Sequence, residues 1–198
     1  MNKFFSNLSL KWYKYLVAFI VSIILWVIVV DIVIAPKKNE RIEIFIGSYG
    51  VSSEINEAVE KPSYIEELVF TDVMIGESYY FILFSSYASS EDVDLFIVKE
   101  SQFRESDIQY YQKLSSEDIE KNFGVFEYFT VNDDIYGIKI YDSKTKTGLL
   151  SDYIKYIEDG EKEEDYYLFF SKHSIHLGEL NDSQYDGVIQ ILKQLLDE

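Results

Sequence analysis

An apolar run near the N-terminus constrains this chain more than any other feature. Between Leu16 and Val30 the only polar residue is Ser22. Counted from Trp12, the segment has 19 residues, which as a helix would measure ~29 Å, about the thickness of a bilayer core. Trp12, Tyr13 and Tyr15 stand at its near end, where a membrane interface favours aromatic rings. A buried core helix would normally show a polar face, so we interpret the run as a transmembrane helix.

The charges of the chain divide at this run. Lys3, Lys11 and Lys14 precede it without any acid, whereas all 35 acids lie at or after Asp31. The first 30 residues therefore carry +3 and the rest carries −20, which together give the net charge of −17. Because basic flanks stay in the cytoplasm, residues 1–14 are predicted to be cytoplasmic and residues 15–35 to span the cell membrane once. The acidic remainder is then extracellular.

A cleaved secretory signal is the alternative interpretation of the same run. Such signals have an apolar part of about 7–15 residues and end in a small-residue cleavage site. The best candidate here, Val33-Ile34-Ala35, is followed directly by Pro36, a poor position for cleavage. The sequence therefore favours an uncleaved anchor, with the bilayer itself as a partner.

Residues 36–40 form a short polar tether, and residues 41–198 are predicted to form one domain. The pattern of strands 41–46, 68–75 and 94–98, with helices 54–60 and 76–88 between them, is typical of right-handed crossovers in a parallel sheet. The rest of the chain predicts further elements: helices 107–114, 116–121, 148–157 and 185–196, a hairpin of strands 126–131 and 135–141 around a loop at 132–134, and strands at 166–170 and 174–177. The predicted fold class is therefore α/β: a three-layer domain with a mainly parallel sheet plus an antiparallel hairpin, preceded by one transmembrane helix.

Several function classes are excluded or disfavoured by composition. With no cysteine, the chain has no disulfide, thiolate metal site or cysteine nucleophile. Its acidity would repel a nucleic acid.

The candidate catalytic and metal-binding residues are few. His173 and His176 lie in no catalytic or metal-binding sequence motif and are interpreted as structural or surface residues. Acidic pairs such as Asp92 with Asp94, or Asp133 with Asp134, are interpreted as solvated turns, with a Ca²⁺ site as the alternative. No catalytic residue, metal or cofactor is predicted, so the chain is not expected to be an enzyme.

A ligand, if there is one, is expected at the carboxyl end of the strands. In open α/β sheets, ligands bind in the loops that follow the strands. Ser48 and Tyr49 follow the first predicted strand, and Ser78 and Tyr79 follow the second. Because the faces of tyrosine rings suit sugars and other small polar solutes, these four residues are the predicted ligand contacts.

Three segments resemble parts of a known protein family, and the end of the chain resembles a second group of proteins. The strand at Ile42–Ile46, the short strand Asp94-Leu-Phe-Ile-Val98 and the later Tyr136-Gly-Ile-Lys-Ile140 look like the first lobe of the family 1 extracellular solute-binding proteins of ABC transporters. The ending, 166–178, is similar to that of small membrane-anchored proteins of Gram-positive bacteria. About 158 residues follow the tether, which is enough for one lobe rather than the family's two. The family's lipid-anchored cysteine is replaced by the helix.

This resemblance implies a one-lobed extracellular binding or accessory module that docks on a transporter or another membrane protein, or presents a small polar solute. The alternative is a structural or assembly subunit of a membrane complex that binds only protein. A concave pocket exposing Tyr49 and Tyr79 would favour the ligand, and a flat apolar patch would favour the protein partner.

Overall fold

The computed structural model of the chain describes residues 2–34, 36–76 and 78–196, which form two compact units, Met1–Lys37 and Lys38–Glu198. Each unit is described by itself. Three predicted segment ends, Met1, Ala35 and Glu198, lie outside the described residues.

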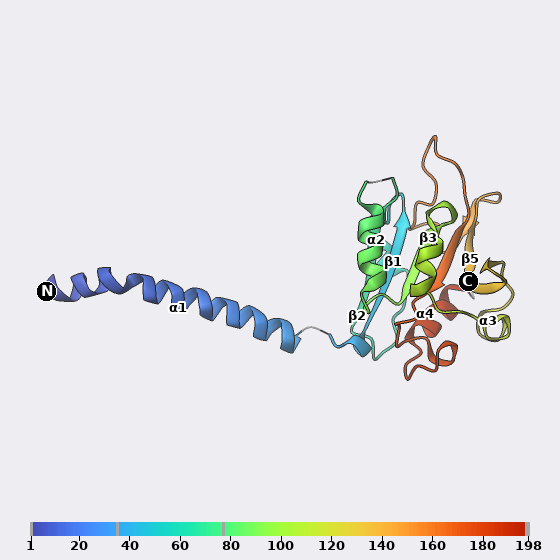
Figure 1. Cartoon of the computed structure of the whole chain (residues 1–198). Coiled ribbons are helices and arrows are strands. Elements are labelled where there is room, and N and C mark those ends of the chain that lie inside the picture. Colours follow the sequence, from blue (N-terminus) through green and yellow to red (C-terminus); the bar gives the residue numbers. More distant parts are fainter. Residues whose placement is uncertain (1, 35, 77, 197–198) are drawn as a thin grey trace. The chain divides into compact units, whose positions relative to one another are not determined.

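The first unit is the helix α1 (Asn2–Ile34) (Figure 1). Within this unit, the large apolar side chains described between Trp12 and Val29 are exposed: Trp26 is 70% exposed, and even Leu16 is 45% exposed. Within the described residues this is the one helix long and apolar enough to cross a membrane, a property that a signal sequence shares. An apolar surface exposed all round a helix needs a non-aqueous surrounding, as the sequence predicts.

The second unit is an α/β domain built on one mixed sheet. Its strand order is β2-β1-β3-β7-β5-β4, and β6 pairs with β5. The strands are β1 (Arg41–Ser48), β2 (Glu67–Met74), β3 (Leu95–Lys99), β4 (Tyr128–Val131), β5 (Asp134–Asp142), β6 (Thr147–Gly148) and β7 (Tyr166–Phe170). Parallel pairing joins β1 to β2 and to β3, and the remaining pairs are antiparallel. The predicted parallel crossovers are thus confined to β2, β1 and β3.

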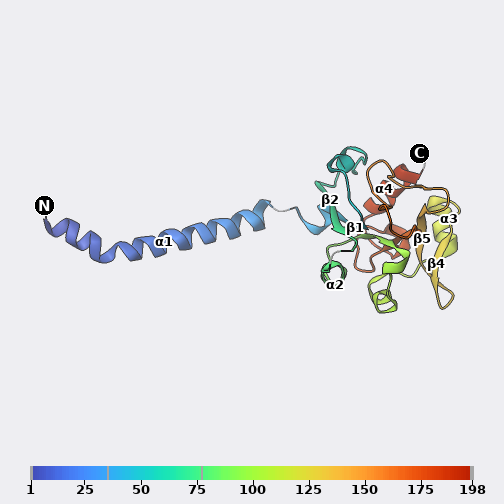
Figure 2. The ribbon, with the colours of Figure 1, turned by 90° about the horizontal axis from the view of Figure 1, so that it is seen from above.

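Helices cover this sheet, and their packing follows the alternation of side chains along β1. Phe45 meets α2 (Tyr80–Ser89), where its ring lies 5.4 Å from that of Phe84 in an edge-on contact. Ile42 lies three residues before Phe45, so its side chain points to the opposite face of the strand, where it meets the start of α4 (Gly187–Leu196). A Cβ on Gly187 would come within 2.8 Å of Ile42 Cδ1, so the glycine allows α4 to approach β1 closely without moving that side chain. Figure 2 shows α2 and α4 well separated, with the strands between them.

The remaining helical segments are short. They are α3 (Ser116–Phe123) and the 3-10 segments at Lys38–Glu40, Ser53–Glu57, Glu100–Gln102, Glu105–Tyr110 and Gly178–Leu180. The α-helices predicted at 54–60 and 107–114 are therefore 3-10 turns. The turn between β4 and β5 is formed by Asn132 and Asp133, both with positive φ, a backbone conformation that these residue types tolerate.

The helix predicted at 148–157 is wrong. Two turns and an isolated bridge, Val51 to Ile154, take its place. The segment pairs with the chain beyond β1: the amide of Ser52 donates to the Tyr153 carbonyl at 2.8 Å, and that of Lys155 donates to the Gly50 carbonyl at 2.8 Å. The apolar spacing of this segment fits a helix, but pairing with a distant segment satisfies its backbone instead. The strand predicted at 174–177 is also wrong: these residues have no regular secondary structure, with a bend at Ile175.

Candidate functional site

The carboxyl ends of β1 and β2 bring the predicted ligand loops together, but not as one exposed site. The amide of Ile75, after β2, donates to the Ser48 carbonyl at 2.8 Å. The Ser48 side chain itself is buried and accepts a hydrogen bond from the Gly50 amide at 3.2 Å. Ser48 therefore shapes the turn and does not face solvent.

The other three predicted contacts lie in different surroundings. Tyr49 is half-buried, and its amide donates to the Lys155 carbonyl at 3.0 Å. Ser78 and Tyr79 lie in the turn before α2, where Tyr79 is 47% exposed. Among the described residues, no hydrogen bond or ring contact joins Tyr49 to Tyr79.

Lys99 is a residue at this edge of the sheet that the sequence analysis missed. It ends β3 and is only 4% exposed, and its ammonium donates to the Tyr49 hydroxyl at 2.9 Å. In the part of the chain that the structure describes, no carboxylate forms an ion pair with it. The rule that singled out Tyr49 would have found Lys99 too, since it directly follows the predicted strand 94–98.

The topology makes this corner a natural place for a ligand. From β1 the chain moves to β2 on one side, and from β2 it moves to β3 on the other side of β1. Open α/β sheets bind ligands where successive connections diverge in this way. The charge of Lys99 also affects the pKa of the nearby Glu164 carboxyl. Burial acts to raise this pKa, but hydrogen bonds from Ser101 and Lys162, together with the charge of Lys99, outweigh burial and lower the pKa.

An exposed apolar surface lies beside this corner. We call Met74, Tyr79, Phe81 and Ile82 the α2 patch; their exposed fractions are 47%, 47%, 40% and 71%. Met74 ends β2, the edge strand of the sheet, and the others lie at the start of α2. The Arg104 guanidinium lies 4.7 Å from the centre of the Phe81 ring and gives the patch a cationic border.

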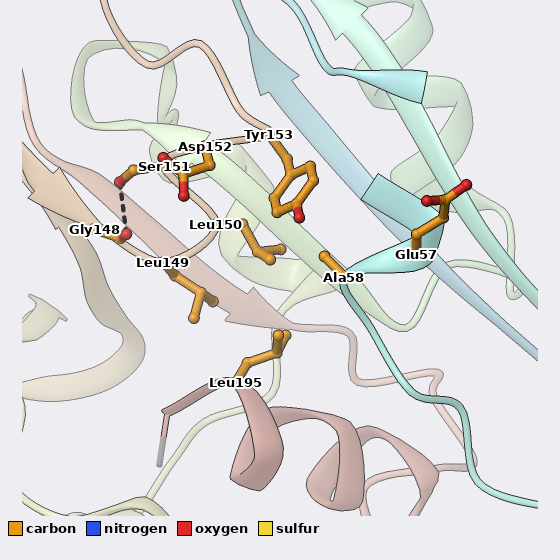
Figure 3. A pocket seen from close by; sticks show the side chains of 9 residues that line it. All are labelled: Glu57, Ala58, Gly148, Leu149, Leu150, Ser151, Asp152, Tyr153 and Leu195. Atoms are coloured by element: carbon orange, nitrogen blue, oxygen red, sulfur yellow. Dashed lines mark hydrogen bonds between the residues drawn. The ribbon is translucent and has the colours of Figure 1, made fainter. Parts of the chain in front are cut away.

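A hollow of about 570 Å³ lies elsewhere on the domain (Figure 3). It is lined by Glu57, Ala58, Gly148, Leu149, Leu150, Ser151, Asp152, Tyr153 and Leu195. None of the four predicted ligand residues contributes to it. The irregular segment that replaces the predicted helix forms most of its wall.

Several of the buried polar groups lie where the chain enters the sheet, and we call Asp94, Ser174, His176 and the Lys38 carbonyl the entry network. The Asp94 carboxylate accepts hydrogen bonds from the Ser174 hydroxyl at 2.5 Å and from the Glu43 amide at 3.0 Å. The Ser174 oxygen accepts from the His176 amide at 3.1 Å, and His176 Nε2 lies 3.1 Å from the Lys38 carbonyl. Burial raises the pKa of Asp94, although these hydrogen bonds act against it.

This network joins distant segments and does not form a nucleophile–base pair. The hydroxyl of Ser174 is engaged by Asp94, and the ring of His176 reaches the backbone of Lys38 instead of the serine. Asp94 is buried whereas Asp92 is exposed, so the two carboxylates do not face a common site that could bind Ca²⁺. Over the described residues, no group of three or more histidines and acids is arranged to hold a metal ion.

Comparisons with known proteins give no relative from which a site could be transferred. No protein-family model matches the chain, and neither a curated protein nor a solved structure matches it. The candidate sites therefore depend on their geometry alone.

Proposed function

We propose that this protein is a membrane-anchored, extracellular accessory module that docks on another membrane protein through the α2 patch. The α2 patch is the observation that carries the proposal. Exposed large apolar side chains that lie close together in the chain, here within 74–82, are typical of protein contacts. Here they flank β2, an edge strand whose outer backbone groups can also pair with a partner.

The anchor favours a partner in the same membrane. A tethered domain meets such a partner at a high effective concentration, so a modest patch is sufficient for stable association. The charge of +3 before the apolar run and −20 after it supports the orientation with the domain outside. The three-layer arrangement, with α2 and α4 on opposite faces, is part of the proposal; the contacts of Phe45 and Ile42 support it.

A solute-binding role related to transporter solute-binding proteins is the second candidate. The observation that favours it is the buried Lys99 on the Tyr49 hydroxyl, at the point where the connections of β1 and β3 diverge. A small polar solute or sugar would contact Tyr49 and Lys99. Titration of the full chain with such solutes, read from the NMR signals of Tyr49, tests this candidate separately from the α2 patch.

The orientation is tested by protease treatment of intact cells. A chain carrying a cytoplasmic N-terminal tag should lose the domain beyond Arg41 to external protease and keep a protected tagged fragment. Full protection of the domain would place it inside and contradict the extracellular assignment.

Docking is tested by site-specific photo-crosslinking in the native membrane. A photoreactive residue at Ile82 should link the chain to a membrane protein, whereas the same residue at Val125 should not. Val125 is a matched control because it is 85% exposed and precedes β4, at the opposite edge of the sheet from β2. Equal crosslinking from both positions, or none from Ile82, would overturn the proposal.

A further inference from the structure

The hollow of Figure 3 combines an apolar floor with acidic walls. In this view the side chains of Leu149, Leu150 and Leu195 lie below the Tyr153 ring, and Asp152 lies to the left of the ring, beside Ser151. Glu57 lies on the opposite rim, past Ala58. Neither carboxylate forms an ion pair with another described residue, and the Tyr153 hydroxyl donates no hydrogen bond within the described chain.

The wall of the hollow is held in place by backbone hydrogen bonds. Leu150 has φ of +53°, a conformation that costs a branched side chain free energy and persists only when neighbouring contacts enforce it. Its carbonyl accepts from the amides of Tyr153 and Ile154, each at 2.9 Å, while the Tyr153 carbonyl accepts from Ser52. The leucine and the tyrosine are therefore presented in a preformed arrangement, which lowers the entropic cost of binding.

We propose that this hollow binds a short basic and apolar polypeptide segment. An arginine or lysine side chain lies against Tyr153 on the side of Asp152, an apolar neighbour packs on the leucines, and Glu57 adds negative charge at the opposite rim. An aromatic face beside unpaired carboxylates is the combination that recognises a guanidinium or an ammonium group.

Size and charge both support this occupant. About 570 Å³ is more than one side chain fills and lies within the usual range for ligand pockets. The part of the chain beyond the apolar run carries −20, so its field draws cations and repels anionic ligands. This site is separate from the α2 patch, and each can fail without the other.

The test is fluorescence anisotropy on the full chain in uncharged detergent, with a dye-labelled Leu-Arg-Leu peptide amide as the probe. Its counterpart in which the neutral citrulline replaces arginine keeps the shape and removes the charge. We expect the arginine peptide to bind at least about fivefold more tightly and to weaken as salt is raised. N-acetylarginine amide alone should bind more weakly than the peptide.

Two double variants locate the binding. Asp152→Asn with Glu57→Gln should weaken the arginine peptide about fivefold to tenfold. Asp159→Asn with Glu161→Gln removes the same charge from an exposed loop outside the hollow and should leave binding unchanged. The proposal would be overturned by equal affinity for the two peptides or by equal effects of the two double variants. It would also be overturned if N-acetylarginine amide bound as tightly as the arginine peptide.

Discussion

The entry network and the α2 patch reverse the usual placement of polar and apolar groups in opposite ways. Asp94, Ser174 and His176 are polar yet at most 4% exposed, while Met74, Phe81 and Ile82 are apolar yet at least 40% exposed. The polar groups inside hydrogen-bond to distant segments of the chain, which contributes to stability, although His176 Nδ1 has no partner among the described residues. The apolar groups outside keep 40% or more of their surface exposed, even where Arg104 lies against Phe81.

This difference separates what holds the domain together from what it offers to a partner. A buried carboxylate leaves its donors without acceptors when it is removed, which is costly. An exposed isoleucine loses little when it is replaced, because it is already in contact with water. Stability and partner binding should therefore respond to substitutions in different places.

The largest effect is expected for Asp94→Ala. The Glu43 amide and the Ser174 hydroxyl would lose their acceptor inside the protein, so the free energy of unfolding should fall by about 2–3 kcal/mol. Chemical denaturation of the full chain in micelles, followed by near-ultraviolet circular dichroism, measures it. Asp92→Ala, at an exposed position two residues away, should change it by less than about 0.5 kcal/mol. Equal effects would show that the network adds no stability.

A smaller loss is expected for His176→Leu. This change removes the hydrogen bond to the Lys38 carbonyl, which ties the start of the domain to the turn after β7, and should cost about 1–2 kcal/mol. The same measurement on His173→Leu, at a half-exposed position, should show less than about 0.5 kcal/mol. A fully stable His176→Leu variant would exclude a structural role for the contact.

The entry network also predicts a pH dependence. Because burial raises the pKa of Asp94 above its usual 3.8, the folded domain holds this proton more tightly than the unfolded chain does. The contribution of Asp94 to stability is thus greatest at low pH and is lost as the pH rises from 3.8 through the raised pKa. The native chain should therefore gain stability relative to Asp94→Asn as the pH is lowered across this range, which unfolding free energies of the two proteins measure. A constant difference would contradict the shift.

The smallest effect on stability is expected for Ile82→Asp, in the α2 patch. Since this side chain is 71% exposed, the free energy of unfolding should change by less than about 0.5 kcal/mol. Co-purification of the membrane partner should nevertheless be lost, because a charge now faces an apolar contact. Val125→Asp should leave both unchanged. Marked destabilisation by Ile82→Asp would mean that the patch belongs to the core.

Local signals in the sequence predicted the parts of the molecule whose structure depends on nearby residues. A long apolar run is sufficient to locate α1 as a helix long and apolar enough to cross a membrane, because both properties depend on local sequence alone. Continuous apolar segments likewise located β1, β3 and β7, which are buried in the middle of the sheet. The carboxyl ends of these strands could be predicted as well, which is why Tyr49 lies where a ligand loop was expected.

The remaining features depend on segments far apart in the chain. Local patterns carry no information on the insertion of β7 between β3 and β5, which limits the parallel part of the sheet to three strands. Pairing with Gly50 and Ser52 turned a helical pattern at 148–157 into the wall of the hollow. The contact of Lys99 with Tyr49 and the burial of Asp94 on Ser174 arise in the same way, since a hydrogen bond forms between whichever groups the tertiary fold brings together. The sequence alone thus determined an α/β domain preceded by a long apolar helix, because both depend on local patterns, and only the tertiary structure decided which surfaces of the domain remain exposed.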